Sequence, residues 1–237
     1  MKKQENNIEK EGNNMNKEKL SKYFDHTLLK PMASTEDFIN FCNEAKKINP
    51  MMVAINSYPV SLCKELLKDT NIKIGAAISF PLGQTTIKTK LDETYNAIND
   101  GADEIDYVVN ISKVKDHDYE YIKDEMQQMV TLCRKYNIII KVIFENCYLT
   151  KEEIKQLCLI AKEVKPDFIK TSTGFGTSGA LFEDVELMVK TVDGCCAVKA
   201  AGGIRDYETC KKMIDLGATR IGTSSSQKIL DEFMEAN

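Results

Sequence analysis

The sequence predicts a single-domain α/β protein with the fold of a (β/α)8 TIM barrel. Short apolar runs alternate with amphipathic stretches throughout residues 20–237, and eight of these runs have the length and composition of buried strands. No Pro-, Gly- or Ser-rich linker interrupts the series, so one domain is favoured over two. The competing architecture is an open doubly wound sheet, which usually has a Gly-rich phosphate loop after its first strand. No GxGxxG motif follows residues 24–28, so the closed barrel is favoured.

Local signals place helices between the expected strands. Ser34 with Asp37 and Thr150 with Glu153 resemble capping boxes, and Pro59 suits the first turn of a helix. Two apolar stripes indicate helix faces that pack on the barrel: Ile87, Leu91, Ala97 and Ile98 form one, and Ile154, Leu157, Cys158, Ala161 and Val164 form the other. The expected strands are 24–28, 51–56, 73–79, 104–109, 138–145, 167–172, 195–200 and 219–223.

Composition excludes several classes of protein. The chain has 237 residues, of which 43% are hydrophobic and 29% charged, and these values are ordinary for a globular protein. Its formal net charge of -4 leaves no basic surplus for nucleic acid. No apolar run approaches the roughly 20 residues that cross a membrane. Residues 1–19 are nearly all Asn, Glu and Lys, so we expect a flexible polar tail that precedes the barrel domain, residues 20–237.

The cysteines and histidines give no metal signature. The eight cysteines include no CxxC pair, and most lie in apolar periodic stretches, which is typical of reduced core residues in a cytoplasmic protein. Cys195 and Cys196 are adjacent on an expected strand and would point to opposite faces. His26 and His117 lie far apart without a partner at ligand spacing. The sequence therefore predicts neither a metal nor a cofactor.

Two lysines carry the main functional signal. Lys170 and Lys199 each close a short apolar run, and 29 positions separate them, about one strand–helix–strand unit. Neighbouring strands lie roughly 5 Å apart, so the two amines would be close in a dry site, and each would disfavour the charged form of the other. One of them is then free to attack a carbonyl, which is the chemistry of an imine-forming aldolase. Spacing alone does not say which lysine attacks. Taken singly, either lysine fits better on the surface with its stem on apolar residues, and only the pair in this context favours a buried site.

Strand alternation indicates which polar side chains face the barrel interior. In 138–145 the apolar face is turned to the helices, so Lys141 projects inward, and in 195–200 the same argument turns Lys199 inward. In 104–109 the apolar trio takes the helix side, which leaves Asp106 inside. Asp106 is then the carboxylate that can move protons, unless it serves only to neutralise the lysines.

Small residues after the last two strands predict a phosphate site. Gly202 and Gly203 follow the seventh strand, and Gly222 to Ser225 follow the eighth and open the last helix. Glycines allow the backbone to approach an anion, and a helix N-terminus offers free N–H groups. These two loops are the usual phosphate site of such barrels, and Arg205 can add positive charge.

These stretches together resemble the deoxyribose-phosphate aldolase family over about residues 20–230. The similar segments are FDHTLLKP at 24–31, AISFPLG at 77–83, GADEIDYVVN at 101–110, KVIFEN at 141–146, DFIKTSTGFGTSGA at 167–180, VKAAGGIR at 198–205 and RIGTSS at 220–225. The resemblance implies a cytoplasmic, metal-independent class I lyase. Its reaction would be the reversible cleavage of 2-deoxy-D-ribose 5-phosphate to D-glyceraldehyde 3-phosphate and acetaldehyde, in deoxyribose phosphate catabolism. Many barrels of this kind pair, so a homodimer is expected.

The resemblance also implies a role for individual residues. Lys170 matches the Schiff-base lysine, Lys199 the second lysine and Asp106 the carboxylate that relays protons. Asp25 and Lys141 match polar groups that line the pocket. The remaining matches are the sugar contact Thr173 and the phosphate contacts Gly174, Gly202, Gly203, Gly222, Ser224 and Ser225.

The chain departs from the family pattern at a few positions, and two other functions stay open. Ala54 stands where many relatives have Cys, Ser57 where they have Pro, and Ser226 where a glycine often follows the double serine; the chain also ends FMEAN, without a C-terminal tyrosine. The alternatives are an aldolase for another phosphorylated aldose and a catalytically silent barrel that binds sugar phosphates.

Overall fold

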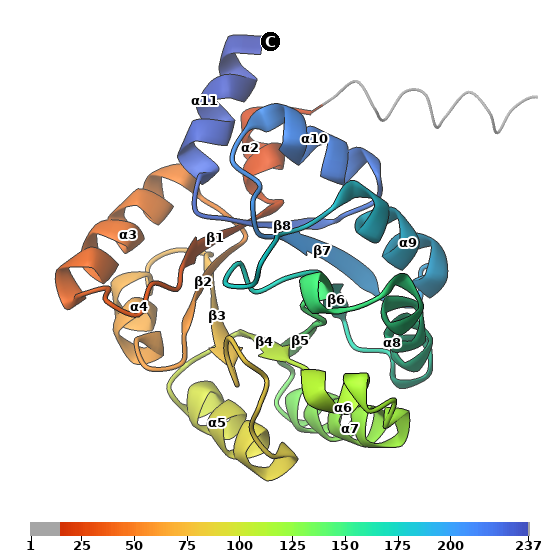
Figure 1. Ribbon diagram of the computed structural model, residues 1–237. Helices are drawn as coiled ribbons and strands as arrows, with labels where there is room; N and C mark the ends of the chain where they lie inside the picture. Colours follow the sequence, from red (N-terminus) through yellow and green to blue (C-terminus); the bar gives the residue numbers. More distant parts are fainter. Residues whose placement is uncertain (1–14, 237) are drawn as a thin grey trace, which may run out of the picture.

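The barrel closes as the sequence predicts. The computed structural model describes residues 15–236, and within them eight parallel strands form one closed sheet in sequence order (Figure 1). Strand β1 pairs with both β2 and β8. Every expected strand is present within two residues of its expected ends. The strands are β1 (Phe24–Leu28), β2 (Met52–Asn56), β3 (Lys73–Ile78), β4 (Glu104–Val108), β5 (Ile139–Ile143), β6 (Phe168–Lys170), β7 (Ala197–Ala201) and β8 (Arg220–Thr223).

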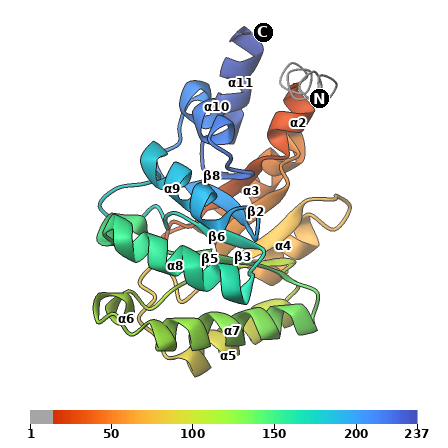
Figure 2. The same cartoon turned by 90° about the vertical axis from the view of Figure 1, so that its right-hand side faces the viewer.

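Helices surround the sheet on its outer face (Figures 1 and 2). They are α2 (Lys17–Ser21), α3 (Thr35–Ile48), α4 (Val60–Leu66), α5 (Ile87–Asn99), α6 (Ile111–Lys115), α7 (Tyr119–Lys135), the 3-10 helix η1 (Asn146–Tyr148), α8 (Lys151–Val164), α9 (Phe182–Val192), α10 (Tyr207–Asp215) and α11 (Ser226–Ala236). None of the helices in residues 15–236 is long and apolar enough to cross a membrane.

The expected helix signals have mixed outcomes. Ser34 and Thr150 both form capping boxes, so these two predictions are confirmed. Pro59 precedes helix α4 as its N-cap residue instead of lying in the first turn. The stripe on α8 is buried throughout. On α5, however, the buried face is centred on Lys90 and Thr94, while Ile87, Leu91 and Ile98 are only half-buried. Helix α5 presents Lys90 to the interior because the Lys90 ammonium pairs with a buried carboxylate of α7.

The N-terminal boundary lies earlier than expected. Residues 1–14 of the expected flexible tail lie outside the described residues. Lys17 to Ser21 form helix α2, so regular structure begins before residue 20. The side chain of Asn16 caps this helix by accepting from the backbone N–H of Lys19, and Leu20 is buried against the barrel. A local cap and one apolar anchor thus hold helix α2 on the barrel.

The two faces of the sheet carry different side chains, so the apolar core and the site lie on opposite sides of the strands. Outward-facing residues such as Ile140, Val142 and Val198 pack against the helices in a continuous apolar core, as strand alternation predicts. The inward faces of β4 to β8 carry charged side chains instead. One detail was wrong: β7 begins at Ala197, so Cys195 and Cys196 precede the strand and do not alternate across it.

Candidate active site

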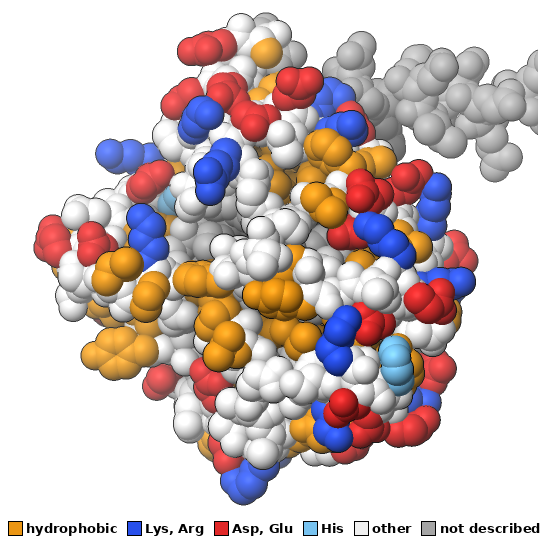
Figure 3. Space-filling model, viewed as in Figure 1, with side chains coloured by type: hydrophobic (Ala, Val, Ile, Leu, Met, Phe, Trp, Pro, Cys, Tyr) orange, Lys and Arg blue, Asp and Glu red, His pale blue; other side chains and the backbone are white. Residues whose placement is uncertain are grey.

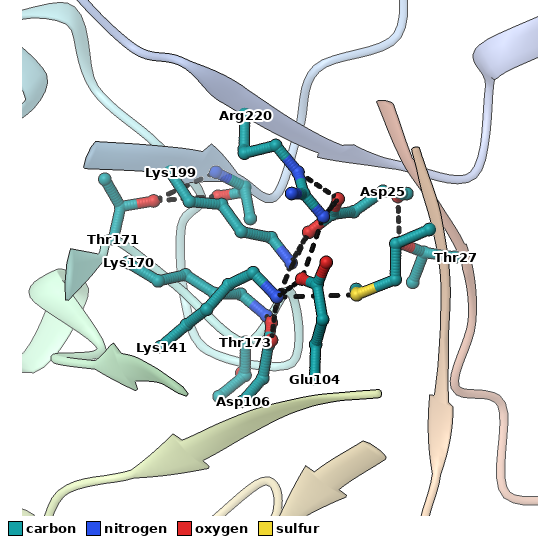
Figure 4. Close-up of polar contacts among 12 residues, drawn as sticks. Asp25, Thr27, Glu104, Asp106, Lys141, Lys170, Thr171, Thr173, Lys199 and Arg220 are labelled. Carbon is teal, nitrogen blue, oxygen red and sulfur yellow. Dashed lines mark hydrogen bonds and ion pairs between the residues drawn. The ribbon is translucent and has the colours of Figure 1, made fainter. Parts of the chain in front are cut away.

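Three neighbouring strands point lysines at one another inside the barrel. Lys141, Lys170 and Lys199 lie on β5, β6 and β7, and Lys170 and Lys199 are direct partners in the register of β6 and β7. All three side chains are buried, and Figure 4 shows their nitrogens converging. Period-two alternation therefore placed Lys141 and Lys199 correctly.

Asp106 on β4 is the common partner of these lysines. Its Oδ2 accepts from Lys170 Nζ at 2.8 Å and from Lys199 Nζ at 2.7 Å, and its Oδ1 accepts from Lys141 Nζ at 2.9 Å (Figure 4). Burial alone would raise the pKa of Asp106, but the three ammonium groups outweigh burial and hold the pKa well below its usual range. Asp106 is therefore an ionised acceptor at neutral pH.

A second layer of charged side chains lies beneath Asp106 and its three lysine partners. Arg220 on β8 donates through Nε to Asp25 Oδ1 at 2.6 Å and through an Nη2 nitrogen to Glu104 Oε2 at 2.9 Å. Asp25 also pairs with Lys199, and Glu104 with Lys141. Sequence reasoning did not single out Arg220 or Glu104 as site residues. Strand parity put Glu104 on the inward face with Asp106, but nothing local identifies its partner on β8.

The ion-paired groups inside the barrel do not balance, although the buried carboxylate of Glu145, outside this network, also acts on Lys170 through its charge. Among residues 15–236, the interior network holds the carboxylates of Asp25, Glu104 and Asp106 and the basic groups of Lys141, Lys170, Lys199 and Arg220. Three carboxylates neutralise three cations, so one basic group lacks a full counter-charge. Lys170 is that group, because its only ion-pair partner is an Asp106 oxygen shared with Lys199.

The pKa of Lys170 reflects this position. Burial lowers it most; Asp106 raises it, and Lys199 and Lys141 lower it further, to about 8. In contrast, the pKa of Lys141 is raised because its three carboxylate neighbours outweigh burial. Lys170 can thus supply a neutral amine near neutral pH.

A cavity opens above Asp106 and its three lysine partners. It has a volume of about 880 Å³ and reaches Lys170 at its floor. Its wall includes these predicted site residues: Thr173, Gly174, Gly202, Gly203, Arg205, Gly222 and Ser224. Asp106, Lys199, Asp25 and Lys141 do not line it. Asp25 and Lys141 were expected on the pocket wall, but they lie below it because the second layer of charged side chains holds them there.

The loops after β7 and β8, where the sequence predicts phosphate contacts, border the cavity on the face of the molecule that Figure 3 shows. Gly202 and Gly203 have φ values of 86° and 79°, which favour glycine, and both lie on the cavity wall. Ser224 lies on the same wall just before α11, whereas Ser225 does not reach the cavity and donates its backbone N–H to Thr223 Oγ1 at 2.9 Å. Exposed Arg205 adds the positive charge at the rim.

Ser226, which departs from the family pattern, has a structural partner. Its hydroxyl lies 3.0 Å from Nδ1 of His26, and both side chains are buried. Burial lowers the pKa of His26 to about 4, so the ring is neutral at physiological pH. The hydrogen bond anchors the N-terminus of α11 to β1 beside the glycine loops.

Strand parity put Glu145, in the KVIFEN segment, on the inward face with Lys141, but sequence reasoning did not single it out as a site residue. It follows β5 with φ 58° and ψ 61°, so the strand parity that places Lys141 does not extend to it. Its buried carboxylate accepts from the backbone N–H of Thr173 at 3.1 Å and from the hydroxyl of Thr173. The residues described include no cluster of three or more His, Cys, Asp or Glu that could hold a metal ion.

Comparison with known proteins agrees with this geometry. Residues 19–229 match the model of the DeoC/LacD family of aldolases. The chain belongs to this family. Among curated members, the deoxyribose-phosphate aldolase of Lactobacillus acidophilus is 55% identical over 210 residues, which is 89% of each chain. The deoxyribose-phosphate aldolase of Thermococcus kodakarensis is 48% identical over 92% of this chain and 98% of its own.

Solved structures show the same family relationship. An aldolase called QR15 superposes with a TM-score of 0.85 at 38% identity and covers 91% of this chain and 96% of its own. The tetrameric deoxyribose phosphate aldolase of Aeropyrum pernix superposes with a TM-score of 0.86 at 30% identity, over 94% of each chain. The (β/α)8 barrel of this DeoC/LacD member is thus the barrel of its relatives.

Proposed function

We propose that this protein cleaves 2-deoxy-D-ribose 5-phosphate reversibly to D-glyceraldehyde 3-phosphate and acetaldehyde through an imine on Lys170. The observation that carries the proposal is the charge imbalance in the barrel. Three carboxylates pair with Lys141, Lys199 and Arg220, and the amine facing the cavity, Lys170, has a pKa lowered to about 8. Relatives named for this activity, at 55% and 48% identity, support the choice of substrate.

The amine begins the reaction. The neutral nitrogen of Lys170 attacks C1 of the open-chain sugar, and loss of water from the carbinolamine gives the imine. The C3 hydroxyl then gives up its proton as the C2–C3 bond breaks. The bonding electrons enter the imine, which becomes an enamine, and C3 leaves as the aldehyde of glyceraldehyde 3-phosphate. Protonation of the enamine at C2 and hydrolysis release acetaldehyde and restore the amine.

Asp106 and Lys199 are placed to move the protons. Asp106 Oδ2 lies within hydrogen-bond distance of both Lys170 and Lys199, so it can pass a proton between the reacting nitrogen and a neighbouring ammonium through a water molecule. Lys199 lies below the cavity, on the same carboxylate oxygen as the reacting amine. We assign the phosphate to the loops of Gly202, Gly203 and Ser224, with Arg205 at the rim.

Reductive trapping tests the imine. Acetaldehyde and borohydride should add a two-carbon fragment to Lys170, located by mass spectrometry of peptides. Lys170→Arg should abolish the adduct, whereas Lys190→Arg, on the exposed face of α9, should leave it intact. An adduct on another lysine, or none, would refute the assignment.

A coupled assay for glyceraldehyde 3-phosphate release decides between the alternatives. A silent sugar-phosphate-binding barrel would bind the substrate without release, although a binding protein has no need of two buried amines on one carboxylate. An aldolase for another phosphorylated aldose would cleave ribose 5-phosphate, or a related sugar, faster than the 2-deoxy compound. We also infer a cytoplasmic location, which the eight free cysteines support, and a homodimer.

A further inference from the structure

The hydroxyl of Thr173 is held from two sides. Its Oγ1 donates to Glu145 Oε2 and accepts from the backbone N–H of Phe175 at 3.0 Å. The other carboxylate oxygen of Glu145 accepts from the backbone N–H of Thr173 at 3.1 Å. Thr173 lies on the cavity wall three residues after Lys170, and Glu145 is only 1% exposed. The orientation of the Thr173 hydroxyl is therefore fixed by the Glu145 carboxylate and the backbone N–H of Phe175.

Counting donors and acceptors shows which kind of hydrogen bond the Thr173 hydroxyl can form with a ligand. A hydroxyl has one proton and two lone pairs, and an ionised carboxylate can only accept. Burial raises the pKa of Glu145, whereas the two hydrogen bonds from Thr173 and the charge of Lys170 favour its ionised form. The proton of Thr173 points to Glu145, and one lone pair is taken by Phe175. One lone pair is left for the cavity, so Thr173 can accept a hydrogen bond from a ligand but cannot donate one.

The backbone at Glu145 has a conformation that is uncommon for a residue of this type. The residue follows β5 in the left-handed region, at φ 58°, where a residue with a long side chain is uncommon. The backbone N–H of the next residue, Asn146, donates to Thr171 O at 2.9 Å and ties this turn to the loop after β6. The turn thus places a carboxylate under the wall of the cavity.

We propose that Glu145 is a specificity-determining positioning residue that makes Thr173 an acceptor for the C4 hydroxyl of the sugar. The inference rests on the proposed function. The C3 oxygen becomes a carbonyl when the C2–C3 bond breaks, and a carbonyl cannot donate to an acceptor. The C4 hydroxyl stays a hydroxyl in both directions of the reaction, so it can donate to Thr173 throughout. C4 becomes the hydroxyl-bearing C2 of glyceraldehyde 3-phosphate.

The test compares two acceptor aldehydes in the synthetic direction with acetaldehyde as the donor. One is glyceraldehyde 3-phosphate, and the other is 3-oxopropyl phosphate, which lacks the hydroxyl that would donate to Thr173. The measured quantity is the ratio of their kcat/KM values. Loss of one hydrogen bond of ordinary strength should lower this ratio by about tenfold. Common steps, such as enamine formation on Lys170, cancel in the ratio.

Four variants separate the outcomes. Glu145→Gln should lower the ratio, because the amide of the glutamine can donate to Thr173 Oγ1 and release its proton toward the cavity. Thr173→Val should lower the ratio to the same extent, and the double variant should lower it no further. Thr173→Ser should keep the ratio. The matched control is Glu152→Gln, on the exposed first turn of α8, which should also keep it.

An unchanged ratio in either Glu145→Gln or Thr173→Val would overturn the inference, so a Glu145 variant that fails to fold does not block the test. Borohydride trapping of acetaldehyde on Lys170 is measured in parallel, because acetaldehyde has no hydroxyl that could donate to Thr173. Normal trapping with an unchanged ratio would reject the role of Glu145 and leave the imine chemistry standing. Absent trapping in the unaltered protein would reject both.

Discussion

Lys170 and Lys199 donate to the same oxygen, Oδ2 of Asp106, at 2.8 Å and 2.7 Å. The sequence argument expected the charge of one lysine to lower the pKa of the other. In the structure burial lowers the pKa of Lys170 most, and the charge of Lys199 acts in the same direction but is smaller than the opposing charge of Asp106. The pKa of the amine is thus a balance that substitutions of its neighbours should move in known directions.

Removing Lys199 should make Lys170 harder to deprotonate. In the unaltered protein the rate of imine formation should rise with pH and level off above about 8, where the amine is neutral. Lys199→Met deletes a cause that lowers this pKa and leaves Asp106 Oδ2 to Lys170, so the rise should move to higher pH. The measurement is the initial rate of borohydride trapping as a function of pH. Lys190→Met, on the exposed face of α9, should leave the curve in place, and a shift to lower pH in Lys199→Met would contradict the assignment.

Asp106→Asn should separate imine formation from proton transfer. The substitution removes a group that raises the pKa of Lys170, so acetaldehyde should still be trapped on the amine. Loss of a positioned acid–base group typically costs about 10²–10⁴-fold in rate, and we expect turnover to fall within this range. Exchange of the acetaldehyde methyl protons in deuterated water, followed by NMR, reports the enamine step. Exchange at the unaltered rate would show that Asp106 only neutralises the lysines.

Strand parity was sufficient to place the residues that alternate on a regular strand. Asp106, Lys141 and Lys199 each have apolar neighbours on both sides in sequence, so the side of the sheet on which they lie is decided within a few residues. The closure of the barrel followed from the same local patterns. These features are confirmed because their causes are contained in single elements.

Features whose cause lies in a distant element were not predicted. Arg220 pairs with carboxylates on β1 and β4, which the sequence separates from it by more than 100 residues. Lys90 resembles a surface cation until Glu125 of α7 is placed opposite it. Glu145 does not follow the inward–outward alternation of β5, because its backbone is left-handed after the strand ends. No short window of sequence contains these partners.

Lys170→Met should stabilise the protein at neutral pH. The pKa of Lys170 is about 8 in the folded state and 10.5 in the unfolded reference, so the unfolded chain binds one more proton between these values. Stability must then rise with pH across this window, and the burial penalty is fully present below pH 8. Removing it should raise the free energy of unfolding by about 3 kcal/mol at pH 7. Urea titrations at pH 7 and pH 10.5 measure the difference between the two proteins, which should shrink at the higher pH; equal differences at both pH values would contradict the folded pKa.

The buried pair of Lys90 and Glu125 should be structural. Both side chains are fully buried, at a distance of 2.7 Å, and Lys90 also donates to Val108 O at 2.7 Å. Lys90→Met leaves a buried carboxylate without its cation, which typically costs about 3–5 kcal/mol. The double variant Lys90→Met with Glu125→Leu removes both charges and should recover most of that loss. Unfolding free energies of the single and double variants give the coupling, and a double variant no more stable than Lys90→Met would show that the pair is not the cause.

Arg205→Gln should weaken binding of the phosphate without touching the chemistry at Lys170. The side chain is exposed at the rim of the cavity, next to the turn formed by Gly202 and Gly203. A hydrogen bond to a charged group contributes about 1.5–3 kcal/mol when it is shielded, and solvent screening brings an exposed one to the lower end, so KM for 2-deoxyribose 5-phosphate should rise about tenfold. KM for unphosphorylated 2-deoxyribose should stay the same, and the effect of Arg205 should shrink with added salt. Arg134→Gln, an exposed arginine of α7 that bonds Lys165 O, is the matched control. Equal losses for both sugars would place Arg205 outside the phosphate site.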